Sequence, residues 1–133
     1  MHSFILHKYS SYTTPKGFEF QLDSLMGSGL YGLISPAGMA RQFGVVNVSK
    51  DMTVFYPGIG GRNLGAGIFV WWMKLTNQRK PLGAFLLCII FNGLADTYPL
   101  LKHDGEVDTV WLHVFNIAVA GLTGSSLLLG LDN

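Results

Sequence analysis

Three ionisable residues, Arg62, Asp96 and His113, lie within apolar stretches of the chain and supply most of its possible chemistry. A carboxylate can take a proton from water or a hydroxyl group, and an imidazolium can donate one, so the set suits general acid–base catalysis. The arginine adds a positive charge that is permanent in proteins. A charged side chain near a bilayer centre costs at least about 2.5–3.5 kcal/mol, so we expect these residues to face a protein interior and to have partners.

The elements that must position these residues are apolar segments at about residues 18–35, 55–75, 81–101 and 109–131. At about 1.5 Å per residue, a helix of this length covers most of a hydrocarbon core. The second segment ends in Trp71 and Trp72 followed by Lys74, a pattern typical of a helix that leaves a membrane at headgroup level. Short connections favour antiparallel neighbours, so we predict an all-α, integral membrane four-helix up-down bundle.

Composition supports the membrane class. The chain has 133 residues, of which 49% are hydrophobic and only 13% charged, and its mean hydropathy is +0.35. The charged share is about half that of a typical soluble domain, which disfavours the alternative of a soluble helical bundle. A net charge of +1 gives no reason to expect a nucleic-acid partner. We predict an N-terminal tail at 1–17, without a signal peptide, and one domain at 18–133.

Small residues and short connections complete the predicted architecture. Gly27, Gly29 and Gly32 in the first segment, and Gly61-x-x-x-Gly65 in the second, are suited to close helix packing within one chain or in a homodimer. Ser-Pro at 35–36 ends the first segment, and residues 37–44 are predicted to form a short interfacial helix. Residues 45–51 are predicted to be a polar connector, and Pro99 is predicted to break the third helix near its end.

The predicted topology brings residues that are distant in the sequence to one depth. Arg62 lies soon after the start of its segment, Asp96 shortly before the end of the next, and His113 soon after the start of the last. In an up-down arrangement these positions lie in one layer, near one face of the bilayer. We therefore predict that Arg62 contacts Asp96.

Further polar residues are expected in this layer. Asn92 lies one turn before Asp96, and Asn116 lies one turn after His113, so each pair shares a helix face. The other candidates for substrate binding are an amide and three phenols in the layer or approaching it: Asn63, Tyr56, Tyr98 and Tyr31.

Such a layer has two interpretations. It can be a buried ion pair that sets helix register, or it can line a polar pocket open to one membrane surface. The variety of side chains favours the pocket, because intramembrane ionisable residues are functional by default. Asp23 is either an interfacial residue or a second acid of the pocket, and the cost of a lipid-facing carboxylate favours the pocket. The single cysteine, Cys88, and the spacing of the histidines disfavour a metal site, and we expect no cofactor.

The chain resembles a family of small four-helix integral membrane proteins of fungi and bacteria. The resemblance extends over about residues 25–131 and depends on Gly-Leu-Tyr-Gly-Leu-Ile-Ser-Pro-Ala-Gly-Met-Ala-Arg-Gln-Phe-Gly at 29–44 and Gly-Gly-Arg-Asn-Leu-Gly-Ala-Gly at 60–67. It also includes Asn92, Asp96 and His113. In size and style the chain is similar to the small membrane epoxide hydrolases of aurovertin-type and citreoviridin-type polyketide pathways.

This resemblance implies an enzyme of secondary metabolism that opens epoxides of a lipophilic polyketide or terpenoid, by hydrolysis or cyclisation, in the endoplasmic reticulum. By analogy with the Asp–Arg–Asp set of limonene-epoxide-type hydrolases, Asp96 would be the base, held by Arg62 and Asn92. Protonated His113 or Asp23 would be the acid. The alternatives are a terpenoid cyclase or isomerase, and a non-catalytic lipid-binding or accessory membrane protein.

Overall fold

The described part of the chain is helical. The computed structural model describes residues 16–45, 47–102 and 106–131, and among these residues it contains no strand. In chain order the elements are α2 (Lys16–Ile34), α3 (Pro36–Gln42), α4 (Lys50–Thr53), α5 (Tyr56–Leu75), α6 (Arg79–Lys102) and α7 (Val107–Leu129). The predicted all-α class is therefore confirmed, whereas most of the predicted N-terminal tail lies outside the described residues.

Local signals explain where the helices begin and end. Ser35 separates α2 from α3, which begins at Pro36, and Pro57 likewise lies in the first turn of α5. Proline suits a first turn because the missing N–H would have no helical partner there. Gly130 follows α7 with φ of +68°, the left-handed conformation that glycine adopts without a steric penalty.

Two details of the prediction are wrong. Pro99 lies inside α6, which continues to Lys102 instead of breaking. Pro99 removes only the hydrogen bond from its own position to the carbonyl oxygen of Ala95, while the buried Thr97 and Leu100 on either side keep this turn packed against the protein. The predicted polar connector also ends in a helix, because its last residues, Lys50 and Asp51, begin the single turn of α4.

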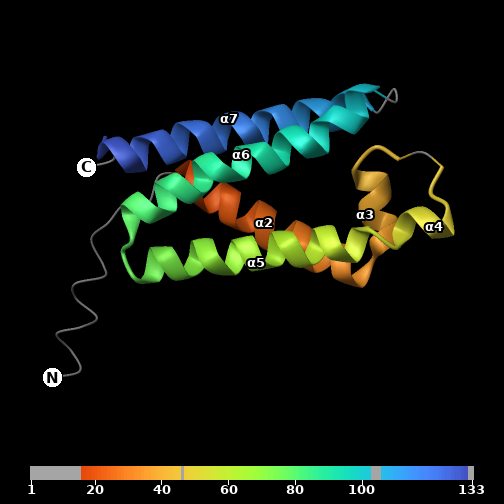
Figure 1. Ribbon diagram of the computed structural model, residues 1–133, viewed down its shortest axis with the longest axis horizontal. Coiled ribbons are helices and arrows are strands. Elements are labelled where there is room, and N and C mark those ends of the chain that lie inside the picture. The colour runs from red at the N-terminus through yellow and green to blue at the C-terminus, as the bar shows by residue number, and fades with distance from the viewer. Residues whose placement is uncertain (1–15, 46, 103–105, 132–133) are drawn as a thin grey trace, which may run out of the picture.

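The four long helices pack as two pairs, α2 with α5 and α6 with α7 (Figure 1). Glycine makes the first pair close: a Cβ added at Gly29 would lie 2.7 Å from Leu64 Cα, and one at Gly32 would lie 2.8 Å from Gly60 Cα. In the second pair, a Cβ at Gly83 would lie 2.7 Å from the carbonyl oxygen of Gly124. Each pair therefore depends on a contact between backbones.

Gly61 and Gly65 do not form the packing surface predicted within one chain, because a Cβ at either position would meet no atom within 4 Å. Gly60 and Gly67 face α2 instead. Successive residues of a helix are turned by about 100°, so Gly61 points away from the face that Gly60 presents. Several faces of α5 carry glycine, and the shape of α2 decides which of these faces packs against it.

Apolar side chains fill the space between the pairs. The buried cluster contains Phe18 and Leu25 of α2, Val70 of α5, Leu82 and Leu86 of α6, and Leu127 of α7. The two pairs meet through contacts of α2 with α7 and of α5 with α6. This cluster holds the pairs together at one end of the cavity described below.

The outside of the molecule is also apolar. Within the described residues, α6 and α7 are long and apolar enough to cross a membrane, and only 17% and 22% of their most apolar stretches are buried. Large exposed side chains include Trp72, Phe91, Trp111, Phe115 and Leu122. Such a surface on a helix indicates membrane association, since a soluble protein would bury or replace it.

Candidate functional site

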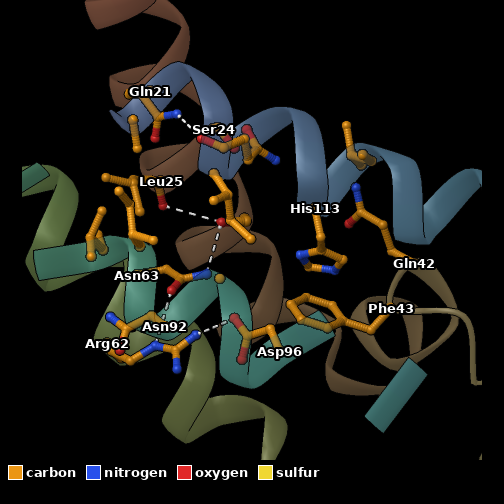
Figure 2. Close-up of a pocket in the computed structure, with 18 residues that line it drawn as sticks. Gln21, Ser24, Leu25, Gln42, Phe43, Arg62, Asn63, Asn92, Asp96 and His113 are labelled. Atoms are coloured by element: carbon orange, nitrogen blue, oxygen red, sulfur yellow. Dashed lines mark hydrogen bonds and ion pairs between the residues drawn. The ribbon is translucent and has the colours of Figure 1, made fainter. Parts of the chain in front are cut away.

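A cavity of about 140 Å³ lies between the two helix pairs, next to the end of α3 (Figure 2). Its apolar wall is formed by Leu25, Ile89, Ile90, Leu112, Ile117 and Ala120, with Phe43 at one side. Its polar side chains are Gln21, Ser24, Ser28, Gln42, Arg62, Asn63, Asn92, Asp96, His113 and Asn116. Apolar walls with convergent polar groups are typical of small-molecule sites, and at about 140 Å³ this cavity is smaller than the usual volume of about 300–1,000 Å³.

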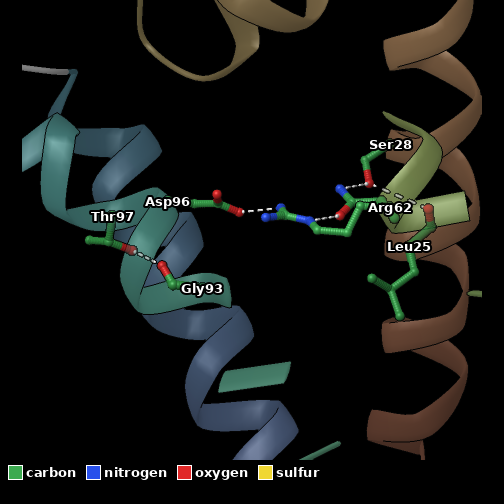
Figure 3. A network of polar contacts seen from close by, with 7 residues as sticks. Leu25, Ser28, Arg62, Gly93, Asp96 and Thr97 are labelled. Carbon is green, nitrogen blue, oxygen red and sulfur yellow. Dashed lines mark hydrogen bonds and ion pairs between the residues drawn. The ribbon is translucent and has the colours of Figure 1, made fainter. Parts of the chain in front are cut away.

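The central contact of the cavity is the ion pair between Arg62 and Asp96. Arg62 Nη2 donates to Asp96 Oδ2 at 2.8 Å, which confirms the predicted contact. The side chains are 35% and 17% exposed, so the pair is partly buried. Because Arg62 belongs to α5 and Asp96 to α6, this bond connects the two helix pairs across the cavity (Figure 3).

A chain of hydrogen bonds fixes the guanidinium from its other side. Arg62 Nε donates to Asn63 Oδ1 at 3.3 Å, and Asn63 Nδ2 donates to Ser28 Oγ at 3.1 Å. Ser28 Oγ in turn donates to the carbonyl oxygen of Leu25 at 3.5 Å (Figure 3). The bonds run in one direction, so each group has a defined donor or acceptor role and the arginine is held between α2 and α6.

His113 lies on α7 across from the end of α3. Its ring centroid is 5.0 Å from that of Phe43 (Figure 2). The Phe43 ring is in turn 6.1 Å from the ring of Tyr56. The imidazole and the Tyr56 phenol both lie within electrostatic range of the Asp96 carboxylate. The Asp96 carboxylate and the His113 imidazole therefore line one chamber, with the Phe43 ring packed beside the imidazole.

The other end of the cavity is formed by Gln21 and Asn116. Gln21 is only 5% exposed, and its Nε2 donates to the backbone oxygen of Asn116 at 2.9 Å. Asn116 Oδ1 is buried and has no hydrogen-bond partner within the described part of the chain. This contact ties α2 to α7, as the Arg62–Asp96 bond ties α5 to α6.

Six of the predicted site residues line the cavity: Arg62, Asn63, Asn92, Asp96, His113 and Asn116. The structure brings them together from α5, α6 and α7. Asn92, however, makes no hydrogen bond to Asp96 within the described residues, so the carboxylate is held by Arg62 and not by that amide.

Asp23 and Tyr98 do not belong to the site, and both predictions are corrected. Asp23 is exposed and does not line the cavity, because α2 turns Gln21 and Leu25 towards it and places Asp23 on another face. Tyr98 is 63% exposed for the same reason, two residues beyond the inward-facing Asp96.

Two other tyrosines lie close to the cavity without lining it. Tyr56 is half-buried and packs edge-on against Phe43. Tyr31 lines a second, open hollow beside the cavity. Neither tyrosine therefore lines the predicted chamber, although Tyr56 packs against Phe43 at its side and Tyr31 lies in the neighbouring hollow.

The sequence reasoning missed the polar row of Gln21, Ser24 and Ser28, and also Gln42. The spacing of the first three, at i, i+3 and i+7, is the helical signal that could have found them, because such residues share one face. Gln42, the last residue of α3, lines the cavity because α3 packs against α2, and no local sequence pattern indicates that packing.

No group of three or more His, Cys, Asp and Glu side chains comes together within the residues that the structure describes. The polar groups of the cavity offer one carboxylate, one imidazole, one guanidinium and several amides and hydroxyls. Such a set can bind an oxygen-bearing molecule and move protons.

The comparison with known proteins gives one match. A family model described as "Domain of unknown function (DUF4267)" matches residues 24–127, which includes every described residue of the cavity except Gln21. No curated protein and no solved structure matches the chain.

Proposed function

The chain belongs to the DUF4267 family, and we propose that it is a small integral membrane enzyme that opens epoxides of a lipophilic polyketide or terpenoid. One observation carries this proposal: the Arg62–Asp96 pair and His113 line the same largely apolar cavity between two helix pairs. A pair that served only to fix register would have no need of a chamber beside it.

We further propose that all four long helices span the membrane in an up-down arrangement, with the endoplasmic reticulum as the host membrane. The exposed apolar surface of α6 and α7 supports this view, as do the exposed Trp71 and Trp72 near the end of α5. The polar residues of α2 and α5 support membrane spanning as well, because Gln21, Ser28 and Arg62 face the cavity and are not directed towards lipid.

The reaction follows from the roles of the two titratable groups. Asp96 takes a proton from water while the water oxygen forms a bond to one epoxide carbon. The bond from that carbon to the ring oxygen breaks, and the imidazolium of His113 gives its proton to the departing oxygen, so the product is a diol. Proton transfer from Asp96 to His113 restores the starting state, directly or through water.

Arg62 has a positioning role in this scheme. Its bond to Asp96 orients the carboxylate, and its bond to Asn63 holds the guanidinium still. The strain of the three-membered ring supplies much of the driving force, so the enzyme has to supply orientation and two proton transfers. In a cyclisation, a hydroxyl of the substrate would replace water as the attacking group.

The test is turnover by purified protein in oxygen-18 water. We expect a lipophilic terminal, internal or terpenoid epoxide to give a diol that contains one heavy oxygen atom. A cyclic ether without heavy oxygen would assign the protein to cyclisation instead. Failure to convert any of these three epoxide classes, with protein that melts cooperatively, would contradict the proposed reaction.

A further inference from the structure

A second hollow adjoins the cavity, between α2 and α3. It is lined by Gly27, Ser28, Tyr31, Gly38, Arg41 and Gln42, and it opens to the outside of the molecule. Ser28 and Gln42 line both spaces, so the hollow and the cavity share a wall. Figure 2 shows Gln42 next to His113 and Phe43 at one side of the cavity.

The polar groups of the hollow are mainly hydrogen-bond donors. Arg41 supplies a guanidinium, Gln42 an amide and Tyr31 a hydroxyl, whereas the Ser28 hydroxyl already donates to the carbonyl oxygen of Leu25. No acidic residue is among the described residues that line the hollow. Arg41 is exposed and has no ion pair within the described part of the chain. By contrast, Arg62 pairs with Asp96 and Lys74 pairs with Glu19. The hollow therefore carries a positive charge that no carboxylate among the described residues pairs with.

Glycine keeps the floor of the hollow open. Gly38 is buried, and a Cβ there would lie 2.5 Å from Ser35 Oγ and would also collide with the hydroxyl of Tyr31. The Tyr31 phenol consequently lies directly over the backbone of α3, with its hydroxyl beside the hollow. Any side chain larger than hydrogen at Gly38 would displace this donor.

We propose that the hollow binds the phosphate or carboxylate of an amphipathic molecule whose apolar part extends towards the cavity. A guanidinium presents paired N–H groups that match the oxygen atoms of either anion. Tyr31 and Gln42 line the same hollow and can donate to the remaining oxygens. This inference deepens the proposed function and rests on it for the substrate class: the molecule whose epoxide reacts in the cavity carries an anionic end.

The test measures binding of dodecyl phosphate to the full chain in phosphatidylcholine nanodiscs, with dodecanol as the neutral probe of equal tail length. We expect a preference for dodecyl phosphate of about tenfold or more. Arg41→Gln should remove this preference, and Gly38→Ala should weaken it without a change in charge. Tyr31→Phe, which removes one hydroxyl and leaves the packing intact, gives the same information if Gly38→Ala does not fold.

The matched control is Lys80→Gln, which removes an exposed positive charge at the start of α6, outside both spaces. It should bind dodecyl phosphate as the wild type does. Equal losses in Arg41→Gln and Lys80→Gln, or no preference for the phosphate over dodecanol, would overturn the proposal.

Changing the lipid composition of the nanodisc shows whether the bound anion comes from a lipid headgroup or from a substrate. If the hollow holds a lipid headgroup, phosphatidylglycerol in the bilayer should compete with dodecyl phosphate; if it takes a substrate, binding should be unchanged. Asp96→Asn should still bind dodecyl phosphate, because Asp96 does not line the hollow. The binding test therefore remains valid if the protein does not turn over epoxides, and the turnover test remains valid if dodecyl phosphate does not bind.

Discussion

At the scale of single residues, Arg62 divides its donors between two partners. Nη2 bonds to Asp96 of α6, and Nε bonds to Asn63, which continues to Ser28 of α2. The guanidinium therefore connects α2 and α5, one helix pair, to a carboxylate on the other pair. A charge-assisted bond of this kind is stronger than a neutral one, so it can fix both the register and the orientation of Asp96.

Asp96→Asn should separate chemistry from folding. The amide has nearly the same shape and can still accept a hydrogen bond from Arg62, but it cannot take up a proton at neutral pH. We expect the variant to fold in detergent while epoxide turnover falls by about 100-fold or more. A variant that melts like the wild type and turns over substrate at the wild-type rate would exclude Asp96 as the base.

Arg62→Leu should lower stability as well as activity, because it leaves the Asp96 carboxylate without its partner. Breaking a fully buried pair costs about 3–5 kcal/mol, and since Arg62 is about one-third exposed we expect a smaller loss. Denaturant titration in mixed micelles, followed by the helical circular dichroism signal, measures this loss of unfolding free energy. Arg41→Gln, at an exposed arginine without an ion pair among the described residues, should leave the midpoint unchanged; an equal shift in both variants would argue against the bridge.

At the scale of elements, glycine determines which helix faces meet. Gly29 and Gly32 of α2 meet the backbone of α5, and Gly83 and Gly124 do the same for α6 and α7. Contacts of this closeness bring the side chains at their edges, Ser28 and Asn63 among them, within hydrogen-bond distance. The close pairs thus act as a rigid frame for the cavity.

Two glycine-to-alanine changes should therefore have opposite signs. At Gly29 the new Cβ would lie 2.7 Å from a backbone atom of Leu64, so we expect a loss of about 1–3 kcal/mol. At Gly65 the Cβ would meet nothing within 4 Å, and alanine should raise stability by up to about 1 kcal/mol through its helix propensity. Thermal unfolding of both variants in one detergent measures the difference, and equal melting temperatures would contradict the close contact of α2 with α5.

At the scale of the whole molecule, the two pairs enclose polar residues and leave apolar side chains outside. Cys88, the single cysteine of the chain, is exposed near the middle of α6. If α6 crosses a bilayer, this thiol faces lipid and has no contact with water.

Labelling of Cys88 tests that arrangement directly. In proteoliposomes we expect reaction with a lipid-soluble maleimide but none with a charged, membrane-impermeant maleimide until the protein is denatured in detergent. The control is Gln78→Cys in a Cys88→Ser background, which places a thiol in the exposed turn before α6 and should react with the charged reagent. Rapid labelling of native Cys88 by the charged reagent would contradict a membrane-spanning α6.

The sequence by itself determined the helices and the central ion pair. Helix ends depend on residues close in the chain, so Pro36 after Ser35 was sufficient to end the first segment, whereas the predicted segment at 109–131 runs past Gly130, where α7 ends. Arg62 and Asp96 were predictable partners because a low-dielectric interior penalises each of them alone, and helix lengths limit their depth.

Only the tertiary structure decided which side of each helix faces the cavity. On α2 the row of Gln21, Ser24 and Ser28 faces inward and Asp23 faces outward, although all four positions are polar. On α5 the glycines that pack are those at 60 and 67, not those at 61 and 65. The physical reason is the same in both cases: neighbouring faces offer nearly equal local chemistry, and the shape of the helix that packs against them selects between them.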